Sequence, residues 1–378
     1  MDQNIEKIKV LICVEDPGAG NFILPIAKSF YKNNHKVLFF AKTTAIAHLD
    51  HSVVTFENIT KETNAQKILL NNDTDLILTG TSEDPFGLSL KLHNYAKELK
   101  IPTISVVDGP ANAGYRFRGN GNYAFSYAPD YILVSDLYTR SLYLNEGFKE
   151  NRVKVVGHPH YNNVRQTGAK FSSQGINYFR KLLYPNAPKN SQILMFASEL
   201  STGLKPDQFL KSHDYTLKGR GSNKERTKIV LEEVLEAINL LEKKPYLVVR
   251  LHPKEKIEFF EEYENEIDLF SREKYPLQFV YAADAVVGMT SMLLMEAAIL
   301  QKPTLSIIPR KTESDWLPSI RMGLTPFVYS KNNIVPFLKK ILLRPNNILP
   351  NSSKYDLFNN SEEDIKDIIL DILRKKNK

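Results

Sequence analysis

Two segments in the second half of the chain place a histidine, an arginine and two hydroxyls where a parallel sheet would expose them. The first is VVRLHP, a β-branched run that ends in Arg250 and His252 before a proline. In the second, Thr290 and Ser291 lie between a later apolar strand and a helix. Such groups donate hydrogen bonds to anions, and a helix N-terminus adds backbone N–H groups. Because ligands of an open parallel sheet bind outside the carboxyl ends of its strands, the pattern predicts a phosphate or pyrophosphate site.

Two neighbouring side chains extend this predicted site toward the rest of a ligand. Lys254 follows the His-Pro pair, and Glu296 lies in the helix that Thr290 and Ser291 precede. We expect both to contact the sugar or ribose of a nucleotide. The alternatives are a buried histidine with satisfied hydrogen bonds at His252 and hydroxyls that only cap a helix, although capping and phosphate binding are compatible.

A carboxylate at a strand end in the first half of the chain is a candidate general base. Asp108 ends the apolar run TISVVD and is followed by a glycine and a proline. There it could take a proton from an acceptor hydroxyl. An aspartate that only caps a turn is an equal alternative. The rival carboxylates at comparable strand ends are Glu15, Asp16 and Glu83.

A glycine-rich turn follows the first predicted strand and precedes the first predicted helix. Its glycines allow the backbone to approach a ligand or a facing loop closely. It lacks the third glycine of GxGxxG and is not a Walker loop, so a dinucleotide site is not expected. The turn either contacts an acceptor or sugar in a cleft or is purely structural. Its candidate contact residues are Glu15, Asp16, Gly18, Gly20 and Asn21.

Several kinds of site are not expected in this sequence. No cluster of histidine, cysteine and carboxylates has metal-ligand spacing, so we predict neither a tight metal site nor a cofactor. There is no GxSxG nucleophile elbow, and no zinc-ligand pairs or RNP pattern that would indicate nucleic-acid binding. The single cysteine, Cys13, lies in an apolar strand, which excludes a disulfide framework and fits a reducing cytoplasm.

Length and composition predict a soluble protein of two domains. The chain has 378 residues, 42% apolar and 25% charged, which is enough for two cores. It carries no signal-peptide pattern and no apolar run that could span a bilayer, so we expect a cytoplasmic protein. The net charge of +7 is compatible with an anionic substrate or an anionic membrane surface. The basic residues 374–376 add to it, although a solvated helix end explains them more often.

Apolar runs alternate with helical patterns along the chain, which predicts doubly wound parallel sheets. The loop over 198–223 is long enough to be mobile or ordered by substrate. In the first half the expected strands are 8–14, 36–40, 75–80, 103–107, 131–135 and 153–157, with helices from residue 22 and over 88–99. In the second half the expected strands are 192–197, VVRLHP, 278–281, 285–288 and 304–308, with helices over 224–243, 292–300, 334–343 and 362–375.

A polar stretch separates the two alternations and defines the predicted domains. We expect an N-terminal Rossmann-like domain on the acceptor side over 1–160 and a junction over 161–190. A C-terminal Rossmann-like domain for the nucleotide donor follows over 191–360, with a closing helix over 361–378. Two such domains would form a cleft between them, where a ligand could bind.

The order of these motifs resembles that of two-domain GT-B glycosyltransferases of bacterial surface-polysaccharide synthesis, in particular sialyltransferases, polysialyltransferases and Kdo transferases. Those families share an Asp-Gly, a later His-Pro and a Ser/Thr-Ser pair before a helix, here at Asp108, His252 and Thr290-Ser291. The resemblance implies a GT-B fold whose sheets face an interdomain cleft, with Asp108 as the base and the other three residues at the donor phosphate. It also implies a CMP-linked donor, inverting and metal-independent transfer, and a C-terminal helix that packs back on the first domain.

A wider similarity covers most of the chain. The segments DPGAGN, IPTISVVDG, VVGHPHYN and GMTSMLLMEAAILQKP are similar to UDP-GlcNAc 2-epimerase-like polysaccharide-biosynthesis proteins. The acidic catalytic positions of the epimerases and their Ser-Gly-Gly are absent, which counts against epimerase activity. CDP-glycerol glycerophosphotransferases share the Arg-x-His-Pro and a later Ser-Ser, which favours a cytidine donor.

Together these features predict a glycosyltransferase that moves a sugar from a nucleotide donor onto a bacterial surface polysaccharide or a lipid-linked glycan. One alternative is a CDP-glycerol glycerophosphotransferase or a UDP-GlcNAc 2-epimerase-like enzyme, and another is a non-catalytic sugar-nucleotide binding protein. The expected partners are the nucleotide-sugar, the glycan or lipid-linked acceptor and, peripherally, the inner face of the cell membrane, but not nucleic acid.

Overall fold

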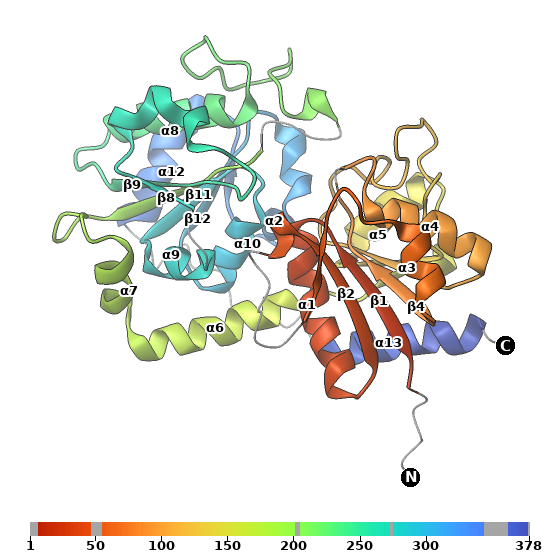
Figure 1. Ribbon diagram of the computed structural model, residues 1–378. Coiled ribbons are helices and arrows are strands. Elements are labelled where there is room, and N and C mark those ends of the chain that lie inside the picture. The colour runs from red at the N-terminus through yellow and green to blue at the C-terminus, as the bar shows by residue number, and fades with distance from the viewer. Residues whose placement is uncertain are drawn as a thin grey trace. The chain divides into compact units, whose positions relative to one another are not determined.

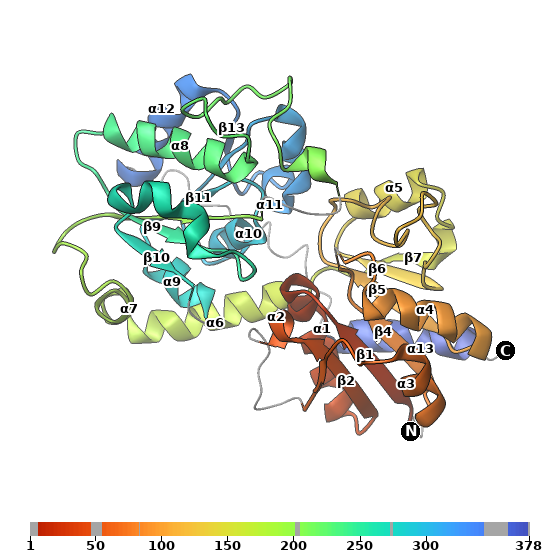
Figure 2. The same cartoon turned by 45° about the horizontal axis from the view of Figure 1, so that its top comes forward.

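Two compact units make up the protein. The computed structural model describes residues 7–46, 55–82, 84–200, 205–272, 275–343 and 362–376. One unit consists of residues 1–162 and 358–378, and the other of residues 163–357. Each is a parallel β-sheet flanked by helices, as the alternation of strand and helix patterns predicts (Figures 1 and 2).

The N-terminal unit is built on a sheet of seven parallel strands. These are β1 (Lys9–Val14), β2 (Lys36–Lys42), β3 (Glu57–Ile59), β4 (Leu76–Thr79), β5 (Thr103–Val107), β6 (Tyr131–Val134) and β7 (Val153–Val155). Their order across the sheet is β3-β2-β1-β4-β5-β6-β7. The direction of winding therefore reverses between β1 and β4, which is where open α/β sheets bind ligands.

Helices cover both faces of this sheet. The helices of the unit are α1 (Pro17–Lys32), α2 (Thr43–Ile46), α3 (Ala65–Asn71), α4 (Leu88–Leu99), α5 (Leu137–Asn145), the short 3₁₀ helix η1 (Glu150–Arg152) and α13 (Glu362–Lys376). Val10 and Ile12 of β1 share a core with α1 and α13, whereas Leu11 and Cys13 share another with α3 and α4. Because successive strand residues point to opposite faces, the two cores lie on opposite sides of the sheet.

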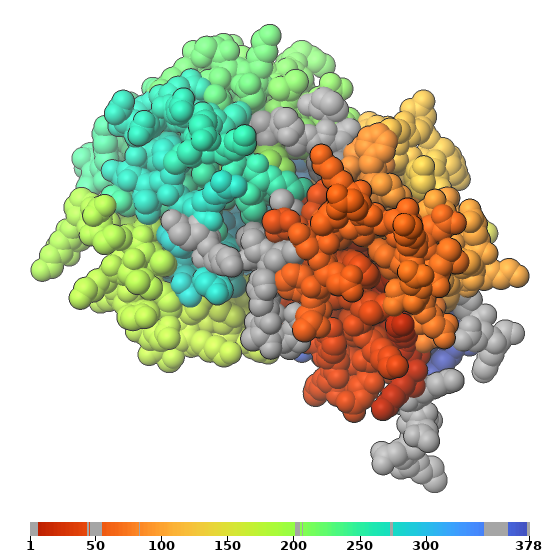
Figure 3. Space-filling model, viewed as in Figure 1, coloured from red at the N-terminus to blue at the C-terminus, as the bar shows by residue number. Residues whose placement is uncertain are grey.

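The C-terminal helix α13 belongs to the core of the N-terminal unit. Its Ile365 and Ile369 are fully buried in the same cluster as α1, and Asn33 at the end of α1 donates a 3.0 Å hydrogen bond to Glu363. On the face shown in Figure 3 little of α13 is visible, since the strands and helices of the first hundred residues lie in front of it. The end of the chain therefore contributes to the fold of its beginning.

The first helix begins five residues before the predicted start at Phe22. Asp16 is extended, and Pro17 occupies the first helical position, where its missing N–H would have no partner in any case. Gly18, Gly20 and Asn21 therefore lie in the first turns of α1 and not in a loop. The expected glycine-rich cleft loop is a helix N-terminus.

The C-terminal unit is built on six parallel strands. These are β8 (Ile193–Ala197), β9 (Tyr246–Arg250), β10 (Leu269–Ser271), β11 (Ala285–Gly288), β12 (Thr304–Ile307) and β13 (Phe327–Val328), in the order β10-β9-β8-β11-β12-β13. The winding reverses between β8 and β11. The helical segments are α6 (His160–Gln174), α7 (Ile176–Leu183), η2 (Pro206–Gln208), α8 (Arg226–Asn239), η3 (Ile257–Glu266), α9 (Pro276–Ala282), α10 (Met292–Ile299), η4 (Lys311–Trp316), α11 (Pro318–Arg321) and α12 (Lys331–Leu343). One face of the sheet packs against α8 and α12.

One expectation for this half of the chain is wrong. The run over 278–281 is not a strand but part of α9, because Pro276 begins a helix there, and the expected strand is replaced by β10. The polar stretch over 161–190, which stays a predicted domain junction, contains most of α6 and all of α7. None of the helices in the described part of the chain is both long and apolar enough to cross a membrane.

The described part of the 198–223 loop is anchored to the C-terminal unit. Tyr215 and Leu217 are buried, and the hydroxyl of Thr216 donates to the carbonyl of Pro309 at 2.9 Å. The buried carboxylate of Glu233 accepts from the backbone N–H groups of residues 218 and 219, at 3.1 and 2.9 Å. Residues 201–204 lie outside the described part of the chain. Mobility or ordering by substrate stays a prediction for this loop, whose described part contacts α8 and the Pro309 carbonyl.

Candidate functional site

Three adjacent strands of the C-terminal sheet deliver polar side chains to one edge. His252 follows β9, Glu199 follows β8, and Thr290 with Ser291 follows β11. Because β9, β8 and β11 are neighbours and parallel, all three strand ends meet at the point where the winding reverses. The sequence predicted the histidine and the hydroxyl pair at this edge, but not Glu199.

The ring of His252 is oriented by its own loop. Its Nδ1 accepts a 3.2 Å hydrogen bond from the backbone N–H of Lys254. A neutral imidazole with Nδ1 as acceptor carries its proton on Nε2. His252 is half-buried, so this Nε2–H is a donor suited to an anionic ligand. Lys254 itself is exposed.

The two hydroxyl residues have different roles. Ser291 is the N-cap of α10, and its Oγ accepts a 3.3 Å hydrogen bond from the backbone N–H of Leu293. Thr290 instead donates both its backbone N–H and its Oγ hydroxyl to the carboxylate of Glu199. The donors predicted to bind a phosphate therefore already hold an anion that belongs to the chain itself. A ligand phosphate would have to share these donors with Glu199 or displace its carboxylate.

Two other predicted contact residues are buried within the unit. Arg250 is 5% exposed; its guanidinium donates to Ser271 of β10 at 2.8 Å and lies over the ring of Phe279 at 5.4 Å. The structure thus places Arg250 against its neighbouring elements, where it supports the strand end. Glu296 is 7% exposed, one turn into α10.

A buried ionic network lies directly behind Thr290. Arg226, at the start of α8, is 2% exposed and donates to Glu199 at 2.9 Å and to Thr290 Oγ at 3.2 Å. Its Nε also donates to the fully buried Glu313 at 2.8 Å, and Arg310 donates to the same carboxylate at 2.7 Å. The desolvation of Arg226 acts to lower its pKa, but the attraction of the two carboxylates raises it above the ordinary value. Arg226 therefore stays charged and holds Glu199 against Thr290.

The only tryptophan of the chain borders this network. The guanidinium groups of Arg226 and Arg310 lie 5.7 and 5.6 Å from the ring centre of Trp316. Nothing in the sequence pattern indicates this cluster, because Arg226 and Glu313 lie far apart in the chain and charged residues are usually exposed.

Glu255 is a second buried carboxyl beside His252. It is 5% exposed and accepts from the backbone N–H of His252 at 2.8 Å and from the hydroxyl of Ser198. The pKa of Glu255 is raised to about 7, mainly by burial and to a smaller extent by the nearby Glu199, while the two hydrogen bonds act to lower it. The carboxyl therefore changes charge near neutral pH.

The raised pKa of Glu255 predicts a stability that falls as pH rises. The folded state holds this proton more tightly than the unfolded chain, so the stabilisation is complete below about pH 4.5 and is lost as pH rises through about 7. Glu255→Gln should raise the free energy of unfolding at pH 8 by on the order of 3 kcal/mol and change it little at pH 5. Denaturant unfolding followed by Trp316 fluorescence measures this, with the exposed Glu258→Gln as control. An equal effect at both pH values would show that Glu255 ionises normally.

The N-terminal unit gathers its own polar groups at the carboxyl ends of β1, β4 and β5. Asp108 follows β5 and is one-fifth exposed, with an ion pair of 3.7 Å from its Oδ1 to Arg116. Arg116 also donates to Thr81, after β4, at 2.8 Å. A Cβ added to Gly18 would lie 2.0 Å from Asp108 Oδ2, so the carboxylate lies directly against the first turn of α1. Arg116 is a member of this group that the sequence did not single out.

The rival carboxylates of this edge have other surroundings. Glu15 is 3% exposed and accepts from the backbone N–H groups of Leu88 and Ser89 at 3.0 and 2.9 Å. It thus caps the N-terminus of α4 and has a structural role. Asp16 is the N-cap residue of α1 and makes no side-chain capping bond. Glu83 lies outside the described residues.

The contact between Gly18 and Asp108 predicts a sensitive position. In Gly18→Ala the new methyl group would overlap Asp108 Oδ2, so the carboxylate must move. If Asp108 acts as a base, a displacement of about 1 Å should lower turnover on the order of 10²-fold. The matched control is Gly109→Ala, because a Cβ at Gly109 meets nothing within 4 Å. Equal activities of the two variants would separate Asp108 from catalysis.

His158 is a buried structural histidine. It is 4% exposed, stacks on Tyr161 with ring centres 4.5 Å apart and contacts Phe22 of α1 at the same distance. Burial, with a smaller effect of His160, lowers its pKa well below the ordinary value, so the ring is neutral. Within the described residues no group of three histidine, cysteine or carboxylate side chains could hold a metal ion.

No protein-family model matches this sequence, and no curated protein is similar to it at a significant level. Solved structures are similar over nearly the whole chain. UDP-GlcNAc 2-epimerase from Methanocaldococcus jannaschii in complex with UDP-GlcNAc and UDP has a TM-score of 0.62 at 16% identity, covering 96% of this chain and 99% of that one. UDP-N-acetylglucosamine 2-epimerase from Rickettsia bellii has a TM-score of 0.64 at 15% identity, covering 98% of both chains.

A solved structure of a glycosyltransferase is similar to the same extent. A glycosyltransferase from Rickettsia africae ESF-5 has a TM-score of 0.62 at 13% identity, with 99% of each chain covered. At such identities the likeness concerns the fold. The wider similarity to UDP-GlcNAc 2-epimerase-like proteins is thus supported at this level, while the closer resemblance to sialyltransferases and Kdo transferases stays a prediction. The chain has the two-domain α/β architecture of GT-B-type epimerases and glycosyltransferases, as the sequence predicted.

Proposed function

We propose that the protein is an enzyme that binds a nucleotide-sugar at the carboxyl edge of its C-terminal sheet and transfers the sugar to a glycan acceptor. One observation carries the proposal: the ends of β9, β8 and β11 bring His252, Thr290 and Ser291 together at the reversal of winding. His252 would donate to the departing phosphate from Nε2, and the first turn of α10 would add backbone N–H groups. Thr290 would also donate to this phosphate once the carboxylate of Glu199 is displaced from its N–H and hydroxyl groups.

The N-terminal unit would bind the acceptor and supply the base. We choose Asp108 as the base because it follows β5, next to the winding reversal between β1 and β4, and is partly exposed, whereas Glu15 caps α4. Arg116, 3.7 Å from Asp108, would keep this carboxylate oriented. The acceptor we propose is a bacterial surface polysaccharide or a lipid-linked precursor.

For the nucleotide, we place uridine ahead of the cytidine that the sequence resemblance implies. Two of the structural neighbours are complexes with UDP-GlcNAc, and another is a complex with UDP. A cytidine donor rests on short motifs alone. Epimerisation of UDP-GlcNAc is the second candidate function, favoured by the full-length likeness to several 2-epimerases.

A ligand panel followed by product analysis tests the proposal. Thermal unfolding in UMP, UDP, CMP, CDP, GDP and dTDP should show stabilisation by UDP, because a ligand of the folded state raises its apparent stability. The gain should vanish in His252→Ala and persist in His213→Ala, an exposed histidine of the same unit. With UDP-GlcNAc, release of UDP in the presence of acceptor supports transfer, whereas an epimeric UDP-sugar supports the second candidate. Stabilisation by CMP or CDP alone would restore the cytidine donor, and no response to any nucleotide would overturn nucleotide-sugar binding.

A further inference from the structure

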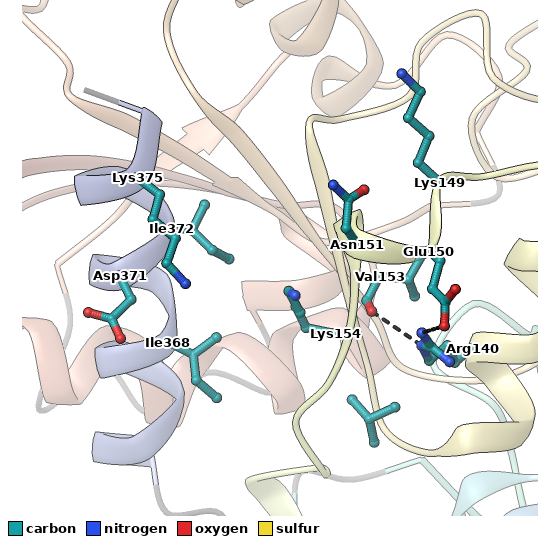
Figure 4. A pocket seen from close by; sticks show the side chains of 11 residues that line it. Arg140, Lys149, Glu150, Asn151, Val153, Lys154, Ile368, Asp371, Ile372 and Lys375 are labelled. Carbon is teal, nitrogen blue, oxygen red and sulfur yellow. Dashed lines mark hydrogen bonds and ion pairs between the residues drawn. The ribbon is translucent and has the colours of Figure 1, made fainter. Parts of the chain in front are cut away.

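An open groove lies along the edge of the N-terminal sheet, away from the residues discussed so far. It has a volume of about 890 Å³ and is lined by the η1–β7 segment on one side and by α13 on the other. Strand β7 pairs only with β6 among the described strands, so its outer edge is not covered by another strand. Figure 4 shows Ile368, Ile372 and Lys375 on the side of α13 that faces Lys154 of β7.

The charges of this groove are unbalanced. Its two acidic residues are already paired: Glu150 with Arg140 at 2.8 Å, and Asp371 with Arg374 at 3.1 Å. Three lysines remain, and none of them forms an ion pair or hydrogen bond with another described residue. They are Lys149, Lys154 and Lys375.

Apolar side chains lie between these lysines. Val155 at the end of β7 is 37% exposed, and Ile368 of α13 is half-buried. None of the residues that line the groove carries a buried side-chain polar atom without a partner. Apolar floor and cationic rim together match the headgroup region of an anionic bilayer, where lysines bind phosphates and short apolar groups enter the interface.

We propose that the groove between β7 and α13 is a docking surface for an anionic membrane. Its three unpaired lysines would contact lipid phosphates, and Val155 with Ile368 would lie at the depth of the headgroups. The groove shares no residue with the proposed nucleotide site, so each proposal can be tested independently of the other. A lysine on an edge strand, such as Lys154, also protects that strand from pairing with another chain. That role does not require Lys149, which precedes η1, or Lys375 of α13.

Vesicle binding by the full chain without nucleotide tests this surface. The protein should sediment with vesicles of phosphatidylcholine and phosphatidylglycerol and not with phosphatidylcholine alone. In the triple variant Lys149→Glu, Lys154→Glu, Lys375→Glu, binding should weaken by on the order of 10²-fold or more. The matched control is Lys67→Glu, Lys91→Glu, Lys97→Glu, which changes the net charge equally on α3 and α4. It should bind like the unaltered protein.

Three outcomes would overturn the proposal. No binding of the unaltered protein to anionic vesicles excludes the surface, and an equal loss in both triple variants reduces the effect to net charge. Full displacement from vesicles by millimolar glycerol phosphate, at constant ionic strength, would identify a pocket for a soluble anion instead. Unchanged thermal unfolding and nucleotide response in the first triple variant confirm that it is folded and keep this test distinct from that of the proposed function.

Discussion

Replacing Arg226 by methionine is expected to lower the free energy of unfolding of the C-terminal unit by about 3–5 kcal/mol. The guanidinium is 2% exposed and pairs with Glu199 and the fully buried Glu313. Methionine keeps most of the aliphatic volume but removes the charge, which leaves Glu313 with Arg310 alone and Glu199 without its cation. A buried carboxylate that loses its partner keeps its desolvation cost, and this cost appears as lost stability.

The chain offers a spectroscopic probe and a matched control for this experiment. Trp316 is the only tryptophan and borders the network, so its fluorescence in denaturant reports the C-terminal unit. Arg220→Met removes an arginine of the same unit that also binds two glutamates, Glu236 and Glu266, but is 33% exposed. Its loss should cost about 1 kcal/mol or less. Equal midpoint shifts for the two variants would contradict the buried-network argument, and Arg226→Met with Glu313→Gln should recover part of the loss.

Replacing His252 by alanine is expected to lower turnover by on the order of 10²-fold while leaving stability nearly unchanged. The imidazole is half-buried at the end of β9, and its Nδ1 accepts from the backbone N–H of Lys254, so a neutral ring carries its proton on Nε2, from which it can donate to an anion. A donor that is aimed in advance at developing charge contributes mainly to the transition state. The loop should keep its shape, because Glu255 binds the backbone N–H of residue 252 and not its side chain.

Steady-state kinetics with the nucleotide-sugar identified by the ligand panel, together with denaturant unfolding, measure both effects. His213→Ala should match the unaltered protein in both measurements. A variant of His252 that loses stability and turnover in proportion would mean that the ring supports the fold and not the reaction. A turnover within about twofold of the unaltered protein would remove His252 from the site.

Much of the fold could be predicted because buried parallel strands leave a local signature. The strands over 103–107 and 285–288 and the helix over 88–99 occur at the predicted residues. A strand that is buried on both faces needs a continuous apolar run, and its ends are marked by polar or glycine residues. Strands β3, β10 and β13, of three, three and two residues, were not predicted, because none of them is a fully buried apolar run. Their pairing depends on neighbouring strands instead.

The sequence by itself determined which groups reach the two sheet edges. Alternating strands and helices force the strands to be parallel, so residues that follow them, such as Asp108, His252 and Thr290, must emerge at carboxyl ends. This rule is local, since it needs only the position of each residue relative to its own strand.

Only the tertiary structure decided how these groups are paired. Glu199 follows β8, Arg226 begins α8 and Glu313 lies in η4. Nothing in their spacing predicts that one cation binds both carboxylates and Thr290. The same holds for the contact between Gly18 and Asp108 and for the burial of Arg250. Burial and pairing depend on distances between segments that are remote in sequence, and the energy of a charge depends on those distances and on access to water. The residue types therefore determine which chemical groups lie at the carboxyl ends of the strands, whereas packing determines their charge interactions.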